Sequence, residues 1–378
     1  MENVLSLKQR YNSCTSCGIC EVICPQKCIH LELNQDAFFT PVLNIDKCIA
    51  CGLCTKVCFK GVDLSSKSEG KTLEDCTVYS AIHKDKEELN LVSSGGVASE
   101  FAKLCFEDGY NVLGAVMDIK RGYSEHIVVK DKNDLNRIKG SKYVQSNIMK
   151  AFEKLDKNKK TLIIGLPCQI YGIRKYIQYF QVEDQFVLVD LFCRGTTSIN
   201  LFQKYKEYLV SYHGLKSIKK VNFRSKVKGW HKFSLVATDE ADTTYENTVY
   251  DDLFYSFYLK NTCFKESCYS CAFRHDRVFS DIRLGDFWGE KYYDHDEGVS
   301  IVAIYSQSGE EIWNKVRERF VVEENEPSEL KRSQRFNKFP VPEFRNELLK
   351  ALSSDEKLED IHKRFGIDKM GFYREKNN

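Results

Sequence analysis

The feature that most constrains this chain is a pair of cysteine runs near its N-terminus. Each run has the spacing C-x2-C-x2-C-x3-C, the first from Cys14 to Cys24 and the second from Cys48 to Cys58. The first cysteines of the two runs lie 34 positions apart, and a short apolar stretch follows each run, at 29–33 and 62–64. The segment therefore reads as an internal duplication, with repeats at about 5–34 and 39–68.

Four cysteines at this spacing are suited to an iron–sulfur cube. In proteins with paired clusters, three thiolates of one run bind one [4Fe–4S] cluster and the fourth reaches the other cluster. The sequence predicts two clusters, with the following ligands: Cys14, Cys17, Cys20 and Cys58 for cluster I, and Cys48, Cys51, Cys54 and Cys24 for cluster II.

The alternative to paired clusters is a pair of zinc sites. Zinc favours two C-x2-C pairs that are separated by a longer spacer, and a doubled run of four cysteines departs from that pattern. Cys28, Cys76 and Cys105 are expected to be free thiols, because the two clusters are complete without them.

The composition indicates a reducing compartment. The chain has 378 residues, 16 of them cysteine, and a formal net charge of +2. No apolar leader precedes the first run, and no stretch approaches the roughly 18 apolar residues of a membrane helix. Clustered cysteines in such a chain indicate metal or redox chemistry rather than disulfides. We expect a cytoplasmic protein with no membrane span, and its charge gives no reason to expect binding to nucleic acid.

The texture of the sequence predicts four parts. Residues 1–66 are cysteine-dense and predict a two-cluster, ferredoxin-type domain of the α+β class, and the polar residues 67–92 predict a linker. Strand-like and helix-like segments alternate over 93–340, which predicts an α/β core with a mixed, largely parallel sheet. Residues 341–378 predict a helical C-terminal tail at the periphery.

Hydrophobic periodicity places the elements of the core. Helices are expected at 97–107 with Ser94 as cap, near 147–155 with Ser146 as cap, from about 169, and at 198–210. Strands are expected at 112–117, 127–129, 161–166 and 186–193, and later strands at 221–224, 233–238, 281–284 and 300–305 are expected to join the same sheet.

A second and scattered set of cysteines lies in the core. Cys168 follows one buried strand, Cys193 ends the next, and Cys268 and Cys271 form a C-x2-C pair. Since the carboxyl ends of neighbouring parallel strands meet at one edge of a sheet, these four thiols are candidates for a third [4Fe–4S] cluster. A zinc site with four thiolates and a set of unrelated thiols are the alternatives, and Cys263 is a competing ligand.

Three further segments are candidates for cofactor binding. Ser93–Gly96 stands at a helix start, where backbone N–H groups bind phosphate, although a plain turn would read the same. Gly140–Ser146 carries Lys142, an aromatic and an amide before a second helix, and an ordinary capped helix is its alternative. Gly285–Gly289 holds two aromatics between glycines, which also suits a turn in the core. No G-x-G-x-x-G follows a strand, so a Rossmann dinucleotide site is not indicated.

In combination these motifs resemble one family. Behind the cysteine runs come the following motifs in order: Ser-Gly-Gly-Val at 94–97, Gly-Ser-Lys-Tyr-Val-Gln at 140–145, Gly-x-Pro-Cys-Gln at 165–169, Phe-Cys-x-Gly at 192–195, Ser-Cys-Tyr-x-Cys at 267–271 and Asp-Ile-x-Leu-Gly-Asp-Phe-Trp-Gly at 281–289. Over about residues 5–310 the chain resembles the coenzyme F420 hydrogenase/dehydrogenase beta-subunit family, with a fused dicluster ferredoxin domain.

The resemblance implies an iron–sulfur flavoprotein oxidoreductase. It implies FAD, with a third [4Fe–4S] cluster beside it on Cys168, Cys193, Cys268 and Cys271. Cofactor contacts are carried over by segment to the following residues: Ser94, Gly95, Gly96, Lys142, Tyr143, Gln145, Asp286 and Trp288. Lys142 is the catalytic candidate, as a cation that would pair with an anionic reduced flavin or a substrate acid, and an ordinary surface lysine is its alternative.

The expected function is electron transfer between a ferredoxin or another redox partner protein and a small organic two-electron substrate through FAD. The deazaflavin coenzyme is one candidate substrate. The alternative is a non-catalytic electron-transfer subunit that feeds a partner enzyme. The sequence does not name the substrate, the direction of flow, the partner or the oligomeric state.

Overall fold

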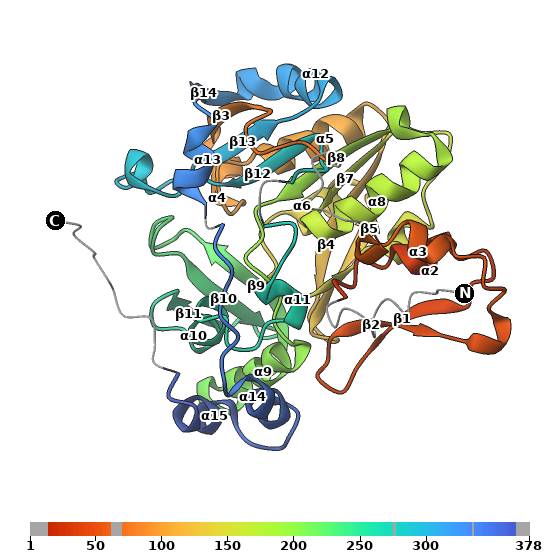
Figure 1. Cartoon of the computed structure of the whole chain (residues 1–378). Coiled ribbons are helices and arrows are strands. Elements are labelled where there is room, and N and C mark those ends of the chain that lie inside the picture. Colours follow the sequence, from red (N-terminus) through yellow and green to blue (C-terminus); the bar gives the residue numbers. More distant parts are fainter. Residues whose placement is uncertain (1–13, 62–69, 275–276, 335, 368–378) are drawn as a thin grey trace.

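The computed structural model describes residues 14–61, 70–274, 277–334 and 336–367 (Figure 1). Its N-terminal unit contains the following elements: α2 (Ile19–Ile23), β1 (Ile29–Leu33), β2 (Phe39–Leu43), η1 (Ile45–Lys47), α3 (Leu53–Lys56) and η2 (Phe59–Gly61). β1 and β2 form an antiparallel pair. The predicted ferredoxin-type region therefore has both helix and strand, as an α+β unit requires.

The internal repeat is also a repeat of backbone conformation. In the first run the chain has positive φ at Ser16 (59°) and Gly18 (81°), and in the second run at Ala50 (53°) and Gly52 (74°). These positions are again 34 residues apart, and each glycine is the N-cap of a short helix, α2 or α3. The two cysteine loops therefore follow the same curled path. The second strand-like stretch, 62–64, lies outside the described residues.

A nine-stranded sheet forms the centre of the core, in the order β14-β3-β13-β12-β8-β7-β4-β5-β6. Its strands are the following: β3 (Thr77–His83), β4 (Asn111–Asp118), β5 (Tyr123–Val128), β6 (Ser146–Asn147), β7 (Thr161–Gly165), β8 (Phe186–Leu191), β12 (Ile282–Asp286), β13 (Ser300–Ile304) and β14 (Phe320–Asn325). Parallel pairing is confined to β12-β8-β7-β4 and β5-β6. The sheet is mixed as predicted, but the other pairings are antiparallel, so "largely parallel" overstated it.

The segment predicted to be a linker instead supplies part of this sheet. β3 lies between β14 and β13 and pairs antiparallel with both, and α4 (Lys86–Asn90) follows it. The polar composition of this segment suggested a linker, but Val78 and Ala81 of β3 are fully buried in two different apolar clusters. Burial on both faces of a central strand, rather than polar composition, decides the structure of this segment.

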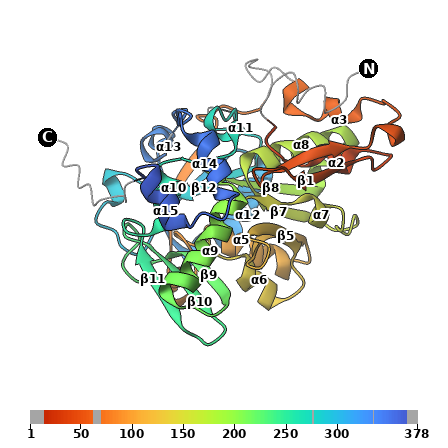
Figure 2. The ribbon, with the colours of Figure 1, turned by 90° about the horizontal axis from the view of Figure 1, so that it is seen from below.

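Two strands predicted to join the main sheet belong to a second one. β9 (Ile218–Ser225), β10 (Ser234–Asp239) and β11 (Thr244–Thr248) form a separate antiparallel sheet. α9 (Ile199–His213), with Ser198 as its N-cap, and α10 (Leu253–Leu259) share its apolar core. The predicted helical tail contains α14 (Arg345–Leu352) and α15 (Leu358–Arg364), which pack beside α9 in both views (Figures 1 and 2). Leu348 and Ile361 are fully buried there, so these helices complete a core instead of lying at the periphery.

The remaining helices flank the sheets, as follows: α5 (Val97–Glu107), α6 (Lys132–Ile138), α7 (Met149–Phe152), α8 (Pro167–Phe180), α11 (Glu266–Tyr269), α12 (Gln307–Val316) and α13 (Ser328–Ser333). α5 has the predicted bounds, but its N-cap is Gly96 rather than Ser94. Ser146 is part of β6 rather than a cap of α7. Among the described helices, none is long and apolar enough to cross a membrane.

The N-terminal unit packs on α8, and the red unit lies beside this helix in both views (Figures 1 and 2). Ile19 and Ile23 of α2 share one buried cluster with Ile173 of α8. Gly172 allows the closest approach, because a Cβ there would lie 3.1 Å from Ile19 Cβ and 3.3 Å from Cys17 Sγ. The loop that carries the first cysteines therefore lies directly on the helix that begins at Pro167.

We expect Gly172→Leu to destabilise the chain by about 1–3 kcal/mol, because added carbon atoms in a filled contact force side chains apart. The free energy of unfolding in urea, measured without oxygen, checks this. Tyr179→Leu changes an exposed position of the same helix and serves as the control. Equal stability of the two variants would mean that the contact has room for a side chain.

Candidate iron–sulfur and cofactor site

The thiols assigned to cluster I lie near one another in the structure. Burial raises the pKa of Cys17 to about 12, and the thiols of Cys58 and Cys14 add to the increase. Burial also raises the pKa of Cys20 well above its ordinary value, with Cys17, Cys14 and Cys58 contributing. Cys58 of the second run thus lies with three cysteines of the first, as expected if the fourth cysteine of each run binds the cluster of the other run. The Ser16 N–H donates to Cys14 Sγ at 3.3 Å.

The thiols assigned to cluster II line a small cavity. Its wall includes the following cysteines: Cys24, Cys28, Cys48, Cys51 and Cys54. Four of them are the predicted ligands. The fifth, Cys28, was predicted to be a free thiol, and its Sγ lies 3.3 Å from Cys24 Sγ.

The second set of cysteines also converges. β7 and β8 are parallel neighbours, so Cys168, at the start of α8, and Cys193, after β8, stand at the same edge. Burial raises the pKa of Cys168 well above its ordinary value, and the other causes are the thiols of Cys271, Cys193, Cys17 and Cys268. Burial likewise raises the pKa of Cys193 to about 12, and the thiols of Cys268 and Cys271 add to the increase.

This donor set suits an iron–sulfur cluster. Buried thiols that disfavour one another's charge are costly as thiolates unless a metal centre supplies compensating charge. Among the described residues, no three His, Cys, Asp or Glu side chains are grouped as ligands of a single metal ion. A cube of four irons takes one thiolate at each corner and therefore spreads its ligands more widely.

Two residues that were not predicted as site residues hold this set together. Gly195 has φ of 153°, and a Cβ there would lie 2.5 Å from Phe264 and 3.3 Å from Cys268 Cβ, so glycine lets the loop after β8 reach α11. Arg274 is buried, and its Nη2 donates to the carbonyl oxygens of Arg194 (2.6 Å) and Cys268 (2.7 Å). A fixed cation beside four thiolates favours their charged state.

The predicted cofactor segments meet in one cavity of about 700 Å³, a volume typical of cofactor sites. Of the predicted residues, the following line it: Ser94, Gly96, Lys142, Tyr143, Asp286 and Trp288. Cys193 and Arg274 form part of the same wall. The cavity therefore borders the second cysteine set directly.

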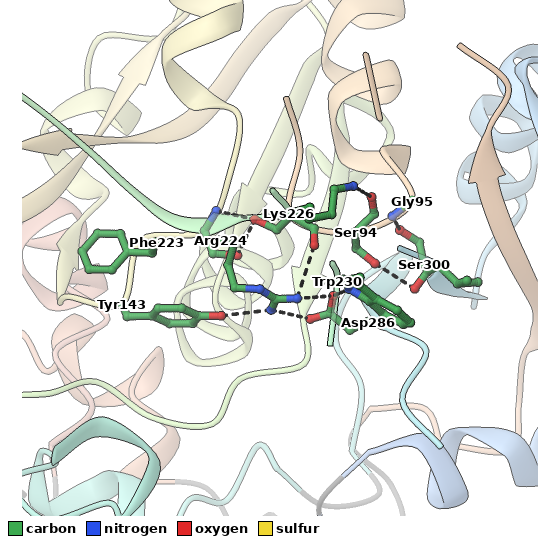
Figure 3. A network of polar contacts seen from close by, with 12 residues as sticks. Ser94, Gly95, Tyr143, Phe223, Arg224, Lys226, Trp230, Asp286 and Ser300 are labelled. Atoms are coloured by element: carbon green, nitrogen blue, oxygen red, sulfur yellow. Dashed lines mark hydrogen bonds and ion pairs between the residues drawn. The ribbon is translucent and has the colours of Figure 1, made fainter. Parts of the chain in front are cut away.

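Arg224 of β9 connects these segments, as Figure 3 shows. It is 4% exposed, and it donates to both oxygens of Asp286 (3.0 and 3.1 Å), to Tyr143 Oη (3.1 Å) and to the Ser93 carbonyl (3.3 Å). Burial disfavours its charge, but the Asp286 carboxylate outweighs burial and raises the pKa of Arg224. Nothing in the sequence near Arg224 marks it, because its partners come from distant segments.

The geometry changes the roles of several predicted residues. Asp286 accepts from Arg224 and from Trp230 Nε1 (2.9 Å), so its carboxylate belongs to a structural network. The Gly95 N–H donates to Ser300 Oγ (2.9 Å), and Ser94 Oγ donates to the Val299 carbonyl (2.7 Å); both bonds tie the turn to β13 and its approach (Figure 3).

Gln145 is buried away from the cavity wall. Its Oε1 accepts from the Phe39 N–H (2.9 Å), a bond that joins the core to β2 of the N-terminal unit. Its role in this structure is to connect the two parts of the chain.

Lys142 stands in the cavity wall as a poorly solvated cation. Its Nζ donates to the carbonyl oxygens of Ile138 and Lys139, both at 2.8 Å. Burial lowers the pKa of Lys142 to about 7. His126 lies in the same wall, and burial lowers its pKa to about 4. Its Nε2 lies 3.0 Å from the Ile164 carbonyl, and its buried Nδ1 has no partner within the described ranges. This histidine carried no motif and was missed.

We expect Lys142 to be acylated as a neutral amine at unusually low pH. Because its pKa is lowered to about 7, the rate of acetylation should rise around pH 7 instead of near the ordinary lysine value. Competitive labelling with acetic anhydride from pH 6 to 10, followed by mass spectrometry of the Lys142 peptide, measures this directly. A rate of acetylation that stays flat through neutral pH and rises only toward pH 10 would contradict the burial of its charge.

Comparisons with known proteins connect the two parts of the chain with described families. Residues 158–330 match the family model for the C terminus of the coenzyme F420 hydrogenase/dehydrogenase beta subunit, and residues 13–62 match the 4Fe–4S dicluster domain. The chain is 27% identical over 347 residues to the coenzyme F420-dependent sulfite reductase of Methanocaldococcus jannaschii, a match that covers 86% of this chain and 50% of the relative. It is 22% identical to a subunit of the F(420)H(2) dehydrogenase of Methanosarcina mazei, over 84% of this chain and 86% of that one.

The chain therefore spans about half the length of the matched sulfite reductase. Among solved structures, a chain of the F420-reducing [NiFe] hydrogenase complex from Methanosarcina barkeri aligns with a TM-score of 0.48 and 20% identity, over 80% of this chain and 94% of that chain. The two family matches confirm the resemblance found in the motifs, and the dicluster match supports iron–sulfur clusters at the N-terminal runs.

Proposed function

We propose that this chain, which joins a 4Fe–4S dicluster domain to the C-terminal domain of the coenzyme F420 hydrogenase/dehydrogenase beta-subunit family, is an iron–sulfur flavoprotein oxidoreductase. It exchanges electrons between a redox partner protein and a small organic substrate through FAD. The N-terminal cysteine runs bind two [4Fe–4S] clusters, and Cys168, Cys193, Cys268 and Cys271 bind a third.

One observation carries the proposal: Cys193 belongs both to the converging cysteine set and to the wall of the large cavity. A redox centre on these cysteines would therefore border whatever the cavity binds. The cysteine sets also follow one another through the molecule. After burial, the Cys54 thiol of the second run is among the groups that raise the pKa of Cys20. The Cys17 thiol likewise helps to raise the pKa of Cys168 in the core set. The assignment thus orders the sites as cluster II, cluster I, cluster III and cavity.

Aromatic packing supports the contact between cluster I and the core set. Phe59, the residue after Cys58, packs edge-on against Phe273 with ring centroids 5.3 Å apart. Phe59 packs against a buried aromatic cluster that contains Phe273, and Cys168 and Cys271 pack against the same cluster. A well-packed protein medium, rather than a solvent gap, therefore separates the two cysteine sets.

The cavity fits an anionic aromatic cofactor of the flavin type. Gly96 and Ser94 lie at the N-terminus of α5, an 11-residue helix, and helix N-termini favour the binding of phosphate. Arg194, Arg274 and Arg332 line the cavity as further cations, and Trp288, Tyr258 and Phe339 offer aromatic faces. When bound, a flavin supplies both one-electron and two-electron chemistry.

The chain's own residues have distinct roles in this proposal. Lys142, with a pKa of about 7, holds or releases a proton at Nζ near neutral pH, where an ordinary lysine would stay charged. Neutral His126 offers Nδ1 as a hydrogen-bond acceptor beside it. Arg224 keeps Tyr143 and the Ser93 turn in register, which fixes the shape of the cavity.

The test is anaerobic purification, followed by measurement of flavin, iron and acid-labile sulfide. We expect FAD together with the iron of three clusters. After reduction with dithionite, one of a panel of acceptors that includes the deazaflavin coenzyme should reoxidise the flavin faster than buffer does. A protein that binds no flavin would refute the proposal, and a colourless protein with zinc would refute the clusters.

The similarity to a subunit of the F(420)H(2) dehydrogenase, over 86% of that subunit, favours a second candidate. In it, the chain is an electron-transfer subunit, and the final reduction takes place on a partner enzyme. The same experiment separates the two: a flavin that is reoxidised only when a partner protein is added supports the subunit.

A further inference from the structure

The cavity assigned to cluster II is lined by five cysteines, although a [4Fe–4S] cluster takes four. We propose that Cys28 is a reserve ligand of cluster II, placed to replace Cys24 on the iron. The inference rests on the cluster assignment under the proposed function and goes beyond it, because the spacing of the runs gives Cys28 no place among the eight assigned ligands.

The Cys28 thiol is buried and lies in contact with an assigned ligand of cluster II. Its Sγ lies 3.3 Å from Cys24 Sγ, and the residue is 2% exposed. Its backbone is anchored, because its carbonyl oxygen accepts from the Asn44 N–H at 2.8 Å and the next residue, Ile29, pairs with Leu43 in the β1-β2 ladder. The thiol therefore cannot drift far from Cys24.

The internal repeat shows that the fold does not require a cysteine at this position. The residue 34 positions after Cys28 is Val62, so the second run lacks the extra thiol. Cys105, on α5, is an ordinary buried thiol by comparison, because it packs among apolar side chains of the main core. Cys28 differs from it in facing a predicted metal ligand.

The exchange is chemically balanced. The Fe–S bond to Cys24 breaks, an Fe–S bond to Cys28 forms, and the proton of the Cys28 thiol passes to the departing Cys24 thiolate. Iron and sulfide keep their oxidation states, so no oxidant or reductant is required. The short contact between the two sulfur atoms places the proton donor beside its acceptor.

The internal repeat supplies a matched experiment in the full chain, purified without oxygen. Cys24→Ala removes the fourth ligand of cluster II, and Cys58→Ala removes the equivalent ligand of cluster I. We expect Cys24→Ala to keep the iron of the unaltered chain. Cys58→Ala and the double variant Cys24→Ala/Cys28→Ala should each lose roughly one iron of four from one cluster and show the paramagnetic signal of an oxidised [3Fe–4S] cluster. Equal iron loss in Cys24→Ala and Cys58→Ala would overturn the proposal.

A second variant keeps the test valid if Cys24→Ala does not fold. Cys28→Val copies the residue of the second repeat and leaves every assigned ligand in place. We expect it to bind the same clusters but to lose iron from cluster II to a chelator roughly 10-fold faster, as when an outer partner of a metal site is removed. Unchanged iron release would contradict the reserve role. Absence of clusters from the unaltered chain would instead refute the cluster assignment itself.

Discussion

Replacing Cys193 by alanine is expected to stop electrons from reaching the cavity while the N-terminal clusters remain reducible. Cys193 lies in the converging set and in the cavity wall, so its loss removes a ligand at the point where the two meet. The rate of reduction of a small-molecule acceptor should fall by more than roughly 100-fold, which exceeds the usual effect of removing an outer partner of a metal site. The chain should also carry roughly a third less iron if the third cluster is lost entirely.

A nearby cysteine provides the matched control for this variant. Cys263 is fully buried and lies five residues before Cys268, and the sequence left it as a competing ligand. Burial raises the pKa of Cys263, and the other groups that shift it include Thr262, the Ser198 N–H and Arg345, each of which lowers it. Cys263→Ala is therefore expected to retain the iron and the activity of the unaltered chain. If Cys263→Ala lost iron while Cys193→Ala kept all of it, Cys263 rather than Cys193 would be the ligand of the third cluster.

The sequence was most informative where function depends on local spacing. The cysteines of each run are neighbours along the chain, so their spacing alone predicts which thiols face one cluster. The second set could also be predicted, because strand and helix patterns placed Cys168 and Cys193 at the ends of adjacent strands. In both cases the relevant geometry extends over one or two elements.

The sequence was least informative where the structure depends on partners far away in the chain. Arg224 bonds to Asp286 and Tyr143, 62 and 81 residues away, and a polar residue in a strand gives no sign of that. β3 fell within a predicted linker because that segment is polar and charged, and pairing with β13 and β14 makes it a strand. The separation of β9 and β10 into a second sheet likewise depends on α9 and α10, whose packing no local pattern encodes.

Replacing Arg283 by methionine is expected to destabilise the core by about 3–5 kcal/mol. Arg283 of β12 and Asp190 of β8 are register partners in the parallel part of the sheet and are 2% and 1% exposed. Two bonds of 2.7 Å join Nε and Nη2 of the arginine to the two carboxylate oxygens. The single variant leaves the Asp190 charge buried without this partner, and urea unfolding without oxygen measures the cost.

The double variant Arg283→Met/Asp190→Leu tests whether the ion pair itself stabilises the core, or whether each charge is only costly when its partner is missing. Replacing both charges with apolar side chains removes the unpaired carboxylate, so most of the stability should return. Lys315→Met, at an exposed pair with Asp108, is the control and should change stability by less than about 1 kcal/mol. If the double variant is as unstable as Arg283→Met, unpaired charge is not the cause. Arg283 also lines the large cavity, so flavin binding by the stable double variant reports whether its charge serves the cofactor as well as the sheet.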